Sequence, residues 1–183
     1  AAVILTDDFA QMMKNDPNDV RSQLIATYQD SGDQLYYNLL LKYPGEKGYD
    51  VPSFDNNYTV IRLSEVYLIA AEAGLKAGGE WRPYALQYLN EIVKRANPAA
   101  EVTDSEFTLD RVLLEREKEL VGEGHRYFDM LRNGKTIIRK GGKHLQNAPQ
   151  EINWDYEKCV LPISRDEFIF NPNMDQNEGY TKE

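Results

Sequence analysis

The first fifty residues contain two runs rich in residues that favour β-strands, at 22–28 and 34–43. A polar turn that includes Gly32 separates them, and Pro44 with Gly45 ends the second run. Although Leu40 interrupts the alternation, the second run places a set of large side chains on one face: Leu35, Tyr37, Leu39, Leu41 and Tyr43. The pattern predicts a β-hairpin, and we expect no helix in this part of the chain.

From Asn57 the apolar spacing changes to three and four, which is typical of helices. The first helix should be capped by residues 55–57 and end at Gly78 and Gly79, and its apolar stripe is Val60, Leu63, Tyr67, Ala70, Ala71 and Gly74. The second should begin near Pro83 and end at Asn97 and Pro98. Its stripe is Leu86, Leu89, Ile92, Val93 and Ala96. Because a short turn joins them, the two segments predict an antiparallel helical hairpin.

A third helical segment follows, capped by Asp104 or Thr108 and interrupted at Gly122 and Gly124. Its apolar positions are Leu109, Val112, Leu113 and Leu120 before the glycines, and Tyr127, Met130 and Leu131 after them. The rest of the chain is irregular apart from a short strand expected at residues 158–161. The sequence therefore predicts a mainly α fold with a small N-terminal β-hairpin and loops (1–56), a helical part (57–134) and a long irregular C-terminal segment (135–183) that packs on it.

The hairpin from Arg62 to Pro98 has the length of one tetratricopeptide unit, and Ala73, Ala85 and Leu89 have that repeat's small-small-large spacing. Glu72 and Lys76 occupy positions where the repeat favours apolar groups, so the match is partial. Such repeats need about three stacked copies to bury their faces. We therefore expect the hairpin to pack against a neighbour beyond these residues.

Composition narrows the range of partners. The formal net charge is −9 over 183 residues, which disfavours nucleic acid and anionic lipid as partners. Cys159 is the single cysteine, so no intrachain disulfide forms and we expect it to be a small core residue. No run is long enough to span a bilayer and no leader is visible, so we expect a processed chain or a piece of a longer one.

Three glutamates recur every four residues on one helix face: Glu115, Glu119 and Glu123. Two of them could form the acid and base of a glycosidase. Basic and acidic neighbours are interleaved with them, however, and arginine keeps a carboxylate ionised, which is the opposite of what a general acid needs. We therefore interpret the region as a structural ionic network without catalytic residues, made of Glu115, Arg116, Glu119, Glu123, Arg126, Asp129 and Arg132.

The remaining candidate chemistry is aromatic. His125 and His144 have no metal-binding spacing, and no nucleotide-binding or nucleophile motif occurs, so we expect no metal, cofactor or catalysis. Trp154 and Tyr156 lie among polar residues in the irregular segment. Aromatic rings beside carboxylates and amides suit sugars, because the ring faces the C–H surface while polar groups bind the hydroxyls. Trp81 is a weaker candidate.

Several segments together resemble the SusD/RagB family. Residues 115–132 are similar to that family's ER..EL..EG.R..D..R signature, and 161–164 with 171–180 are similar to its PIP…NPNLxQNPGY ending, with Ser164 and Glu178 in place of two prolines. Residues 62–73 and 89–96 match the helices before the signature, and 19–21 and 42–45 match earlier landmarks. Family members are several times longer, so the resemblance covers their C-terminal part.

The resemblance implies a surface-exposed outer-membrane lipoprotein, anchored by a lipid outside this chain, that hands oligosaccharides to a SusC-type TonB-dependent transporter. A peptide-binding member of the RagB type is the nearest alternative. A helical-repeat scaffold for proteins and a glycosidase using Glu115, Glu119 or Glu123 are the others. The charge pattern of the signature indicates architecture rather than a ligand site.

Overall fold

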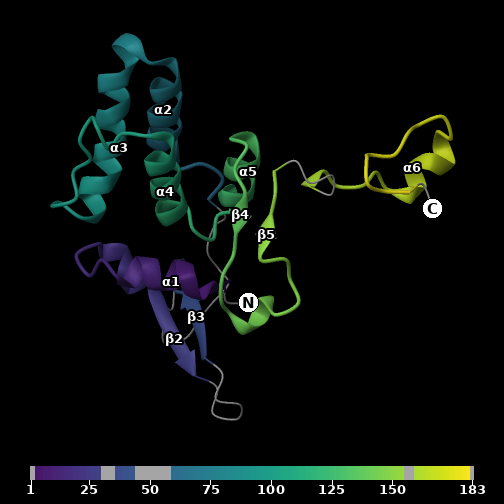
Figure 1. Ribbon diagram of the computed structural model, residues 1–183, viewed down its shortest axis with the longest axis horizontal. Coiled ribbons are helices and arrows are strands. Elements are labelled where there is room, and N and C mark those ends of the chain that lie inside the picture. The colour runs from purple at the N-terminus through teal and green to yellow at the C-terminus, as the bar shows by residue number, and fades with distance from the viewer. Residues whose placement is uncertain (1–2, 30–35, 44–58, 155–158, 182–183) are drawn as a thin grey trace.

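The computed structural model describes residues 3–29, 36–43, 59–154 and 159–181. A helical body, α2 to α5, lies beside a small sheet that carries α1 on one face (Figure 1). Two of the helices form a hairpin, in agreement with the predicted mainly α fold. The helices are α1 (Asp7–Lys14), α2 (Leu63–Ala77), α3 (Arg82–Ala96), α4 (Leu109–Glu119), α5 (His125–Arg132) and α6 (Arg165–Phe170). The strands are β1 (Val3–Leu5), β2 (Ile25–Gln29), β3 (Tyr36–Leu40), β4 (Ile137–Ile138) and β5 (Glu151–Ile152).

The predicted hairpin is present: β2 pairs antiparallel with β3, with Tyr28 opposite Tyr37. The prediction that no helix occurs here is wrong, since α1 covers the sheet, and β1 also pairs with β3. Helix α1 was missed because it has only two turns. Its buried Ala10 and Met13 pack against Leu5, Ile25 and Leu40 of the sheet in one small hydrophobic core.

The hairpin of α2 and α3 forms the main core, but α2 presents a different face from the one predicted. Val60 and Leu63 of the predicted stripe are 74% and 68% exposed, and Leu68, which the stripe did not include, is fully buried. Ala71 of the stripe is buried as predicted. Residues 59–62 are not helical and α2 begins at Leu63, while the cap expected at residues 55–57 lies outside the described residues. Apolar side chains surround most of α2, so its own sequence could not select the buried face. Contact with α3 and α4 selected it.

The ends of the helices follow local rules. Helix α2 stops at Gly78, whose φ is +67°, and Pro83 occupies the first turn of α3. The side chain of Thr108 accepts a hydrogen bond from the Arg111 amide at 3.2 Å and so caps α4. The prediction of these boundaries from glycine, proline and threonine is confirmed.

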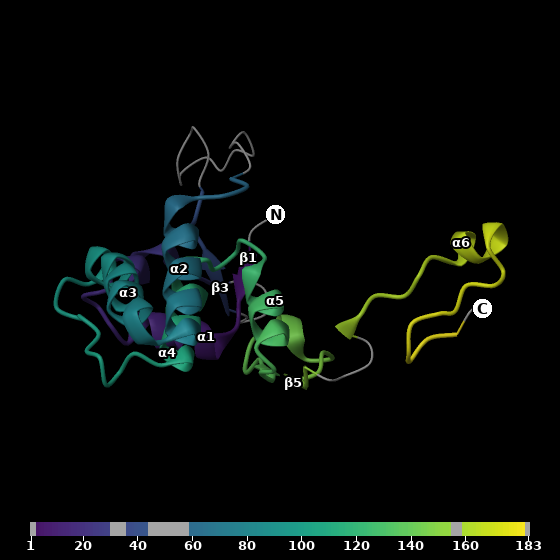
Figure 2. The ribbon, with the colours of Figure 1, turned by 90° about the horizontal axis from the view of Figure 1, so that it is seen from above.

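The C-terminal segment has two parts. Strands β4 and β5 pair beside α5, whereas α6 stands away from the helical body in both views (Figures 1 and 2). The strand predicted at 158–161 is not present in residues 159–161, and residue 158 lies outside the described ranges. Cys159 is half-exposed rather than in the core, and its thiol donates to the Asn153 carbonyl at 3.4 Å.

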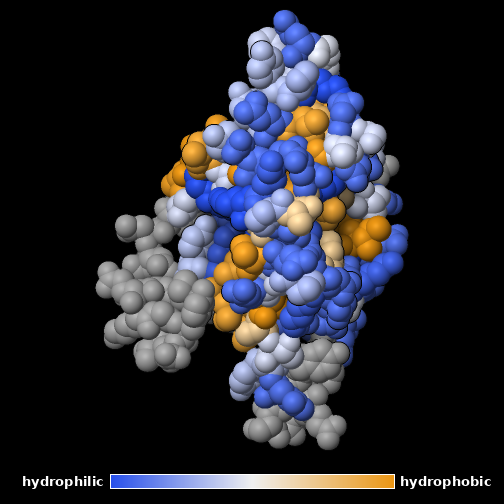
Figure 3. All heavy atoms as spheres, turned by 90° about the vertical axis from the view of Figure 1, so that its left-hand side faces the viewer, coloured by the Kyte–Doolittle hydropathy of each residue, from blue (hydrophilic) through white to orange (hydrophobic). Residues whose placement is uncertain are grey.

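The side of the molecule that lies to the left in Figure 1 is largely hydrophilic, with separate apolar patches (Figure 3). Within the described residues, no helix is both long and apolar enough to cross a membrane.

Candidate functional site

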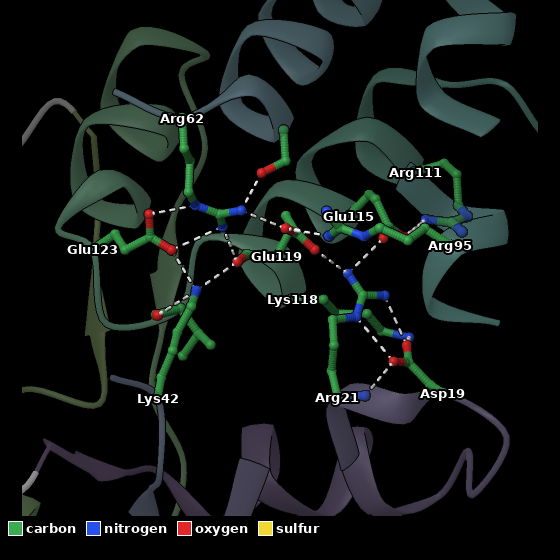
Figure 4. A network of polar contacts seen from close by, with 12 residues as sticks. Asp19, Arg21, Lys42, Arg62, Arg95, Arg111, Glu115, Lys118, Glu119 and Glu123 are labelled. Atoms are coloured by element: carbon green, nitrogen blue, oxygen red, sulfur yellow. Dashed lines mark hydrogen bonds and ion pairs between the residues drawn. The ribbon is translucent and has the colours of Figure 1, made fainter. Parts of the chain in front are cut away.

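Glu115 and Glu119 of α4 face the sheet and the N-terminal segment, and they lie at the centre of a buried ionic network (Figure 4). Glu115 and Glu119 are 1% and 4% exposed. Glu123 belongs to the turn after α4 and joins the same network. The four-residue spacing places Glu115 and Glu119 on one side of α4, as the sequence indicated, whereas Glu123 lies beyond the end of the helix.

Three guanidinium groups surround the Glu119 carboxylate. Its oxygens lie 2.6 Å from Arg62 Nη1, 2.5 Å from Arg95 Nη2 and 3.1 Å from Arg21 Nη1. Burial raises the pKa of Glu119, but the hydrogen bonds from Arg95 and Arg62 outweigh it and hold the pKa at about 2. Glu119 is therefore ionised at neutral pH and has no proton to give to a leaving group.

Arg21 connects α4 to the N-terminal segment. It contacts both Asp19 oxygens, at 2.9 Å from Nε and 2.7 Å from Nη2, and its Nη1 lies 2.7 Å from Glu115 Oε1. The last contact is an ion pair that lacks hydrogen-bond alignment. Burial acts to lower the pKa of Arg21, but the hydrogen bonds that it donates to Asp19 and the charge of Glu115 raise the pKa overall, so Arg21 stays charged.

Lys42 follows β3 and reaches the C-terminal end of α4. Its Nζ donates to the Glu119 carbonyl at 2.7 Å and forms a close ion pair with Glu123. Arg62, just before α2, binds the other Glu123 oxygen through Nε at 2.8 Å. A cation at a helix C-terminus is favourable. These contacts fasten the sheet and the start of α2 to the turn between α4 and α5.

A second cluster lies between α2, α4 and α5. Arg116 Nε donates to Asp129 Oδ2 at 2.7 Å, and both side chains are nearly inaccessible to solvent. Arg132 Nη2 bridges Asp129 Oδ1 at 2.7 Å and Glu72 Oε2 at 2.6 Å. Burial raises the pKa of Glu72, but the hydrogen bonds from Arg132 and Lys76 hold it at about 2. Glu72 is polar where the tetratricopeptide pattern favours an apolar residue, and here it accepts the hydrogen bonds that hold this cluster together.

Arg126 belongs to neither cluster. The sequence suggested that it lies among Glu119, Glu123 and Asp129, but it pairs with Glu117 at 2.9 Å and its side chain is 38% exposed. Glu117 points away from Glu115 and Glu119 because it is two positions, or about 200°, from each around the helix. Its pKa is raised by burial, in spite of the charge of Arg126.

The network contains residues that the sequence analysis did not assign to it. Asp19, Arg21, Lys42, Arg62 and Arg95 come from segments up to about a hundred residues from α4 in the chain. Two of these segments, 19–21 and 42–45, were noted only as family landmarks. The alternation of acid and base in Asp19-Val20-Arg21 is the local signal that could have indicated an ion pair, which Arg21 forms with Asp19.

The predicted ligand residues are elsewhere. Trp154 is 53% exposed at the end of the β4–β5 pair, and its ring lies over Gly134, where an added Cβ would be 3.8 Å from the indole. The adjacent Asn153 accepts from the Thr136 hydroxyl at 3.2 Å. Tyr156 lies outside the described residues. Within those residues, no group of three or more His, Cys, Asp or Glu side chains is arranged for a metal ion.

A family model described as the SusD family matches residues 10–180. The starch-binding protein SusD of Bacteroides thetaiotaomicron is 33% identical over 69% of this chain, which spans 22% of that protein. The SusD-like protein P25 of Formosa agariphila is 31% identical over 70% of this chain, which spans 26% of that protein. The chain is thus far shorter than these relatives.

Solved structures are similar over almost the whole chain. A SusD superfamily protein from Bacteroides vulgatus is 54% identical, with a TM-score of 0.89, and the match covers 96% of this chain and 39% of the Bacteroides vulgatus chain. A SusD superfamily protein from Bacteroides thetaiotaomicron is 43% identical, with a TM-score of 0.84, and the match covers 95% of this chain and 40% of the Bacteroides thetaiotaomicron chain. Family model, sequence identity and three-dimensional agreement all point the same way, and the chain belongs to the SusD family.

Proposed function

We propose that this chain is part of a non-catalytic oligosaccharide-binding protein that serves nutrient uptake at the outer membrane. The main observation in support is the similarity to the starch-binding SusD of Bacteroides thetaiotaomicron, which is 33% identical over 69% of this chain. In this proposal the protein passes its ligand to a SusC-type TonB-dependent transporter. A lipid anchor outside these residues holds it at the cell surface.

The chemistry of the ionic network supports binding rather than hydrolysis. A glycosidase needs one carboxylic acid that keeps its proton near neutral pH. Glu119 and Glu123 have lowered pKa values because, although burial raises them, hydrogen bonds from Arg95, Arg62 and Lys42 outweigh it. Both carboxylates serve to join segments of the fold, so the network is structural in this proposal.

Within this chain, Trp154 and Tyr156 are the proposed contacts to sugar. The half-exposed Trp154 indole offers an apolar face to the C–H surface of a pyranose ring. Asn153, beside it, provides an amide to hydroxyl groups. Because the chain spans 39% of the similar Bacteroides vulgatus structure, we expect other parts of the fold to supply the rest of the site. The isolated chain should therefore bind sugars weakly.

Calorimetry against a panel of oligosaccharides tests this proposal on a chimera in which this chain replaces the matching part of that Bacteroides vulgatus protein. We expect one or more glycans to bind, with at least about a tenfold loss of affinity in Trp154→Ala. Tyr28→Ala is the matched control, because Tyr28 is similarly exposed at 55% but lies on β2. It should leave the affinity unchanged.

Other outcomes would overturn parts of the proposal. Binding of a peptide panel with no binding of any glycan would indicate a peptide-binding member. Hydrolysis of a glycan that is lost in Glu117→Gln or Glu119→Gln would show that the protein is an enzyme. An equal loss in Trp154→Ala and Tyr28→Ala would remove the assignment of Trp154 as a contact.

A further inference from the structure

The proposed sugar contact Trp154 belongs to a short segment whose ends are joined by a hydrogen bond. Asn153 follows β5 and directly precedes Trp154, and Cys159 lies six positions after Asn153. The Cys159 thiol donates to the Asn153 carbonyl at 3.4 Å and so closes the base of this segment. Tyr156, the second proposed contact, lies between them in the sequence.

A further hydrogen bond fixes this base to α5. The Tyr127 hydroxyl donates to the Cys159 carbonyl at 2.7 Å, although the two residues are 32 positions apart. We call these two hydrogen bonds, from Tyr127 to Cys159 and from Cys159 to Asn153, the clasp. The clasp connects a helix of the body to the residue beside Trp154.

Helix α5 is a firm support for the clasp. Its Asp129 pairs with the buried Arg116, and its Arg132 bridges Asp129 to Glu72 on α2. The ring of Tyr127 packs edge-to-face against Phe128, with centroids 5.5 Å apart and planes at 83°. Side chains that are locked by packing and ion pairs can position a binding residue precisely.

Other contacts orient Trp154 and Asn153 from the side of β4. The Trp154 indole lies over Gly134, and the Thr136 hydroxyl donates to Asn153 Oδ1 at 3.2 Å. Because the amide oxygen of Asn153 accepts from Thr136, its NH₂ group is directed away from Thr136 and can donate to a sugar hydroxyl. Thr136 therefore holds the side chain of Asn153, and the clasp holds its main chain.

We propose that Tyr127 and Cys159 are positioning residues, which hold Trp154 and Asn153 in the orientation in which they meet a sugar. This inference rests on the proposed function, since it takes Trp154 as a contact. Neither positioning side chain contacts the ligand, because each acts through the main chain of the next residue in the clasp. Helix α5 thus supports the ligand segment in addition to its part in the ionic network.

The fluorescence of Trp154 tests the positioning without any ligand. Trp81→Phe leaves Trp154 as the single tryptophan of the chain. In this background Tyr127→Phe removes the hydroxyl but keeps the ring beside Phe128. We expect the anisotropy decay of Trp154 to gain amplitude on the nanosecond timescale, because the indole moves more freely. A purely structural role would instead lower the melting temperature and leave the decay unchanged.

Tyr28→Phe is the matched control, since it also removes a tyrosine hydroxyl from a half-exposed side chain but lies on β2. It should leave the decay unchanged. Equal decays for Tyr127→Phe and Tyr28→Phe would overturn the inference.

A conservative substitution at Cys159 tests the second hydrogen bond of the clasp. Cys159→Ala removes the donor and should change the Trp154 decay as Tyr127→Phe does. Cys159→Ser keeps a donor at this position and should restore most of the original decay. Equal decays for Cys159→Ala and Cys159→Ser would show that the thiol does not position Asn153.

Affinity separates this inference from the proposed function. In the chimera with the Bacteroides vulgatus protein, Tyr127→Phe should lower the affinity for the bound glycan at least about threefold, the effect of one hydrogen bond. An unchanged affinity and decay in Tyr127→Phe, with a loss of affinity in Trp154→Ala, would overturn the inference and leave the proposed function intact. A changed decay in Tyr127→Phe, with no loss of affinity in Trp154→Ala, would support the clasp and contradict the proposed contact at Trp154.

Discussion

Arg21 shows how single side chains hold distant segments together in this protein. Its guanidinium contacts Asp19, Glu115 and Glu119, and its side chain is only 9% exposed. Planar guanidinium groups suit this role because they stay charged and present several donors in fixed directions. Arg126 is the contrasting case, since it forms an ion pair with Glu117, donates to the Leu113 carbonyl at 3.3 Å and has a side chain that is 38% exposed.

Replacing Arg21 by alanine should strongly destabilise the fold. The substitution leaves the buried Glu115 and Asp19 carboxylates with less compensation, and removing one partner from a buried ionic group costs roughly 3–5 kcal/mol. Arg126→Ala, which the sequence alone suggested would be as damaging, should cost no more than about 1 kcal/mol because its pair is partly solvated. Urea unfolding of both variants measures the difference. Equal free energies of unfolding for the two variants would contradict the structural assignment.

At the level of elements, the turn between α4 and α5 determines how the helical body meets the sheet. Gly122 and Gly124 adopt φ values of +78° and +83°, a region that disfavours residues with a Cβ. At Gly122 the backbone also passes close to β3, where an added Cβ would lie 2.6 Å from Leu40 Cδ2. Two glycines that look alike in the sequence therefore have different roles.

The two glycine-to-alanine variants should separate backbone strain from crowding. Gly124→Ala meets no atom within 4 Å, so its cost should be the strain of a left-handed residue, about 1–2 kcal/mol. Gly122→Ala carries the same strain and must also displace Leu40, which adds roughly 1–3 kcal/mol. Chemical denaturation of both variants tests this order. Finding Gly124→Ala to be the more damaging one would show that Leu40 does not pack against this turn.

Across the whole molecule, charge is distributed unevenly between surface and interior. The chain carries a net charge of −9, yet the cations of the network in Figure 4 outnumber its carboxylates. Those cations are Arg21, Lys42, Arg62, Arg95, Arg111 and Lys118, against Asp19, Glu115, Glu119 and Glu123. Stability consequently depends on carboxylates that remain ionised.

The free energy of unfolding should therefore fall in acid. Glu72 and Glu119 have folded pKa values of about 2 against an ordinary 4.5, so the unfolded state binds more protons between these values. Their contribution is complete above about pH 5 and is lost as the pH falls toward about 2. Glu117 changes the free energy of unfolding with pH in the opposite direction, because its pKa is raised in the folded state.

Urea unfolding at a series of pH values measures this loss. Glu72→Gln should be less stable than the original chain at neutral pH and should lose less stability on acidification. Glu80→Gln, at an exposed position, should follow the original curve. A Glu72→Gln curve parallel to the original would mean that Glu72 does not titrate with a lowered pKa.

Local sequence determined the elements whose signals are short-range. Pro83, Thr108 and the glycines at 78 and 79 mark helix boundaries through their own backbone and side-chain preferences, which need no distant partner. The β2–β3 pairing likewise follows from two strand-favouring runs and a turn. The recurrence of Glu115, Glu119 and Glu123 indicated one charged face, and the family motifs indicated the fold.

Only the tertiary structure decided which partners these groups have. The sequence placed Arg126 in the network and left Arg21, Lys42 and Arg62 out, because ion pairs between distant segments depend on how the segments pack and not on their spacing. The buried face of α2 was predicted wrongly at Val60 and Leu63 for the same reason: apolar residues lie on most of its sides, and burial of Leu68 rather than Leu63 is set by α3 and α4. The sequence of a helix shows the spacing of its apolar residues, but which of its faces is buried depends on the segments that pack against it.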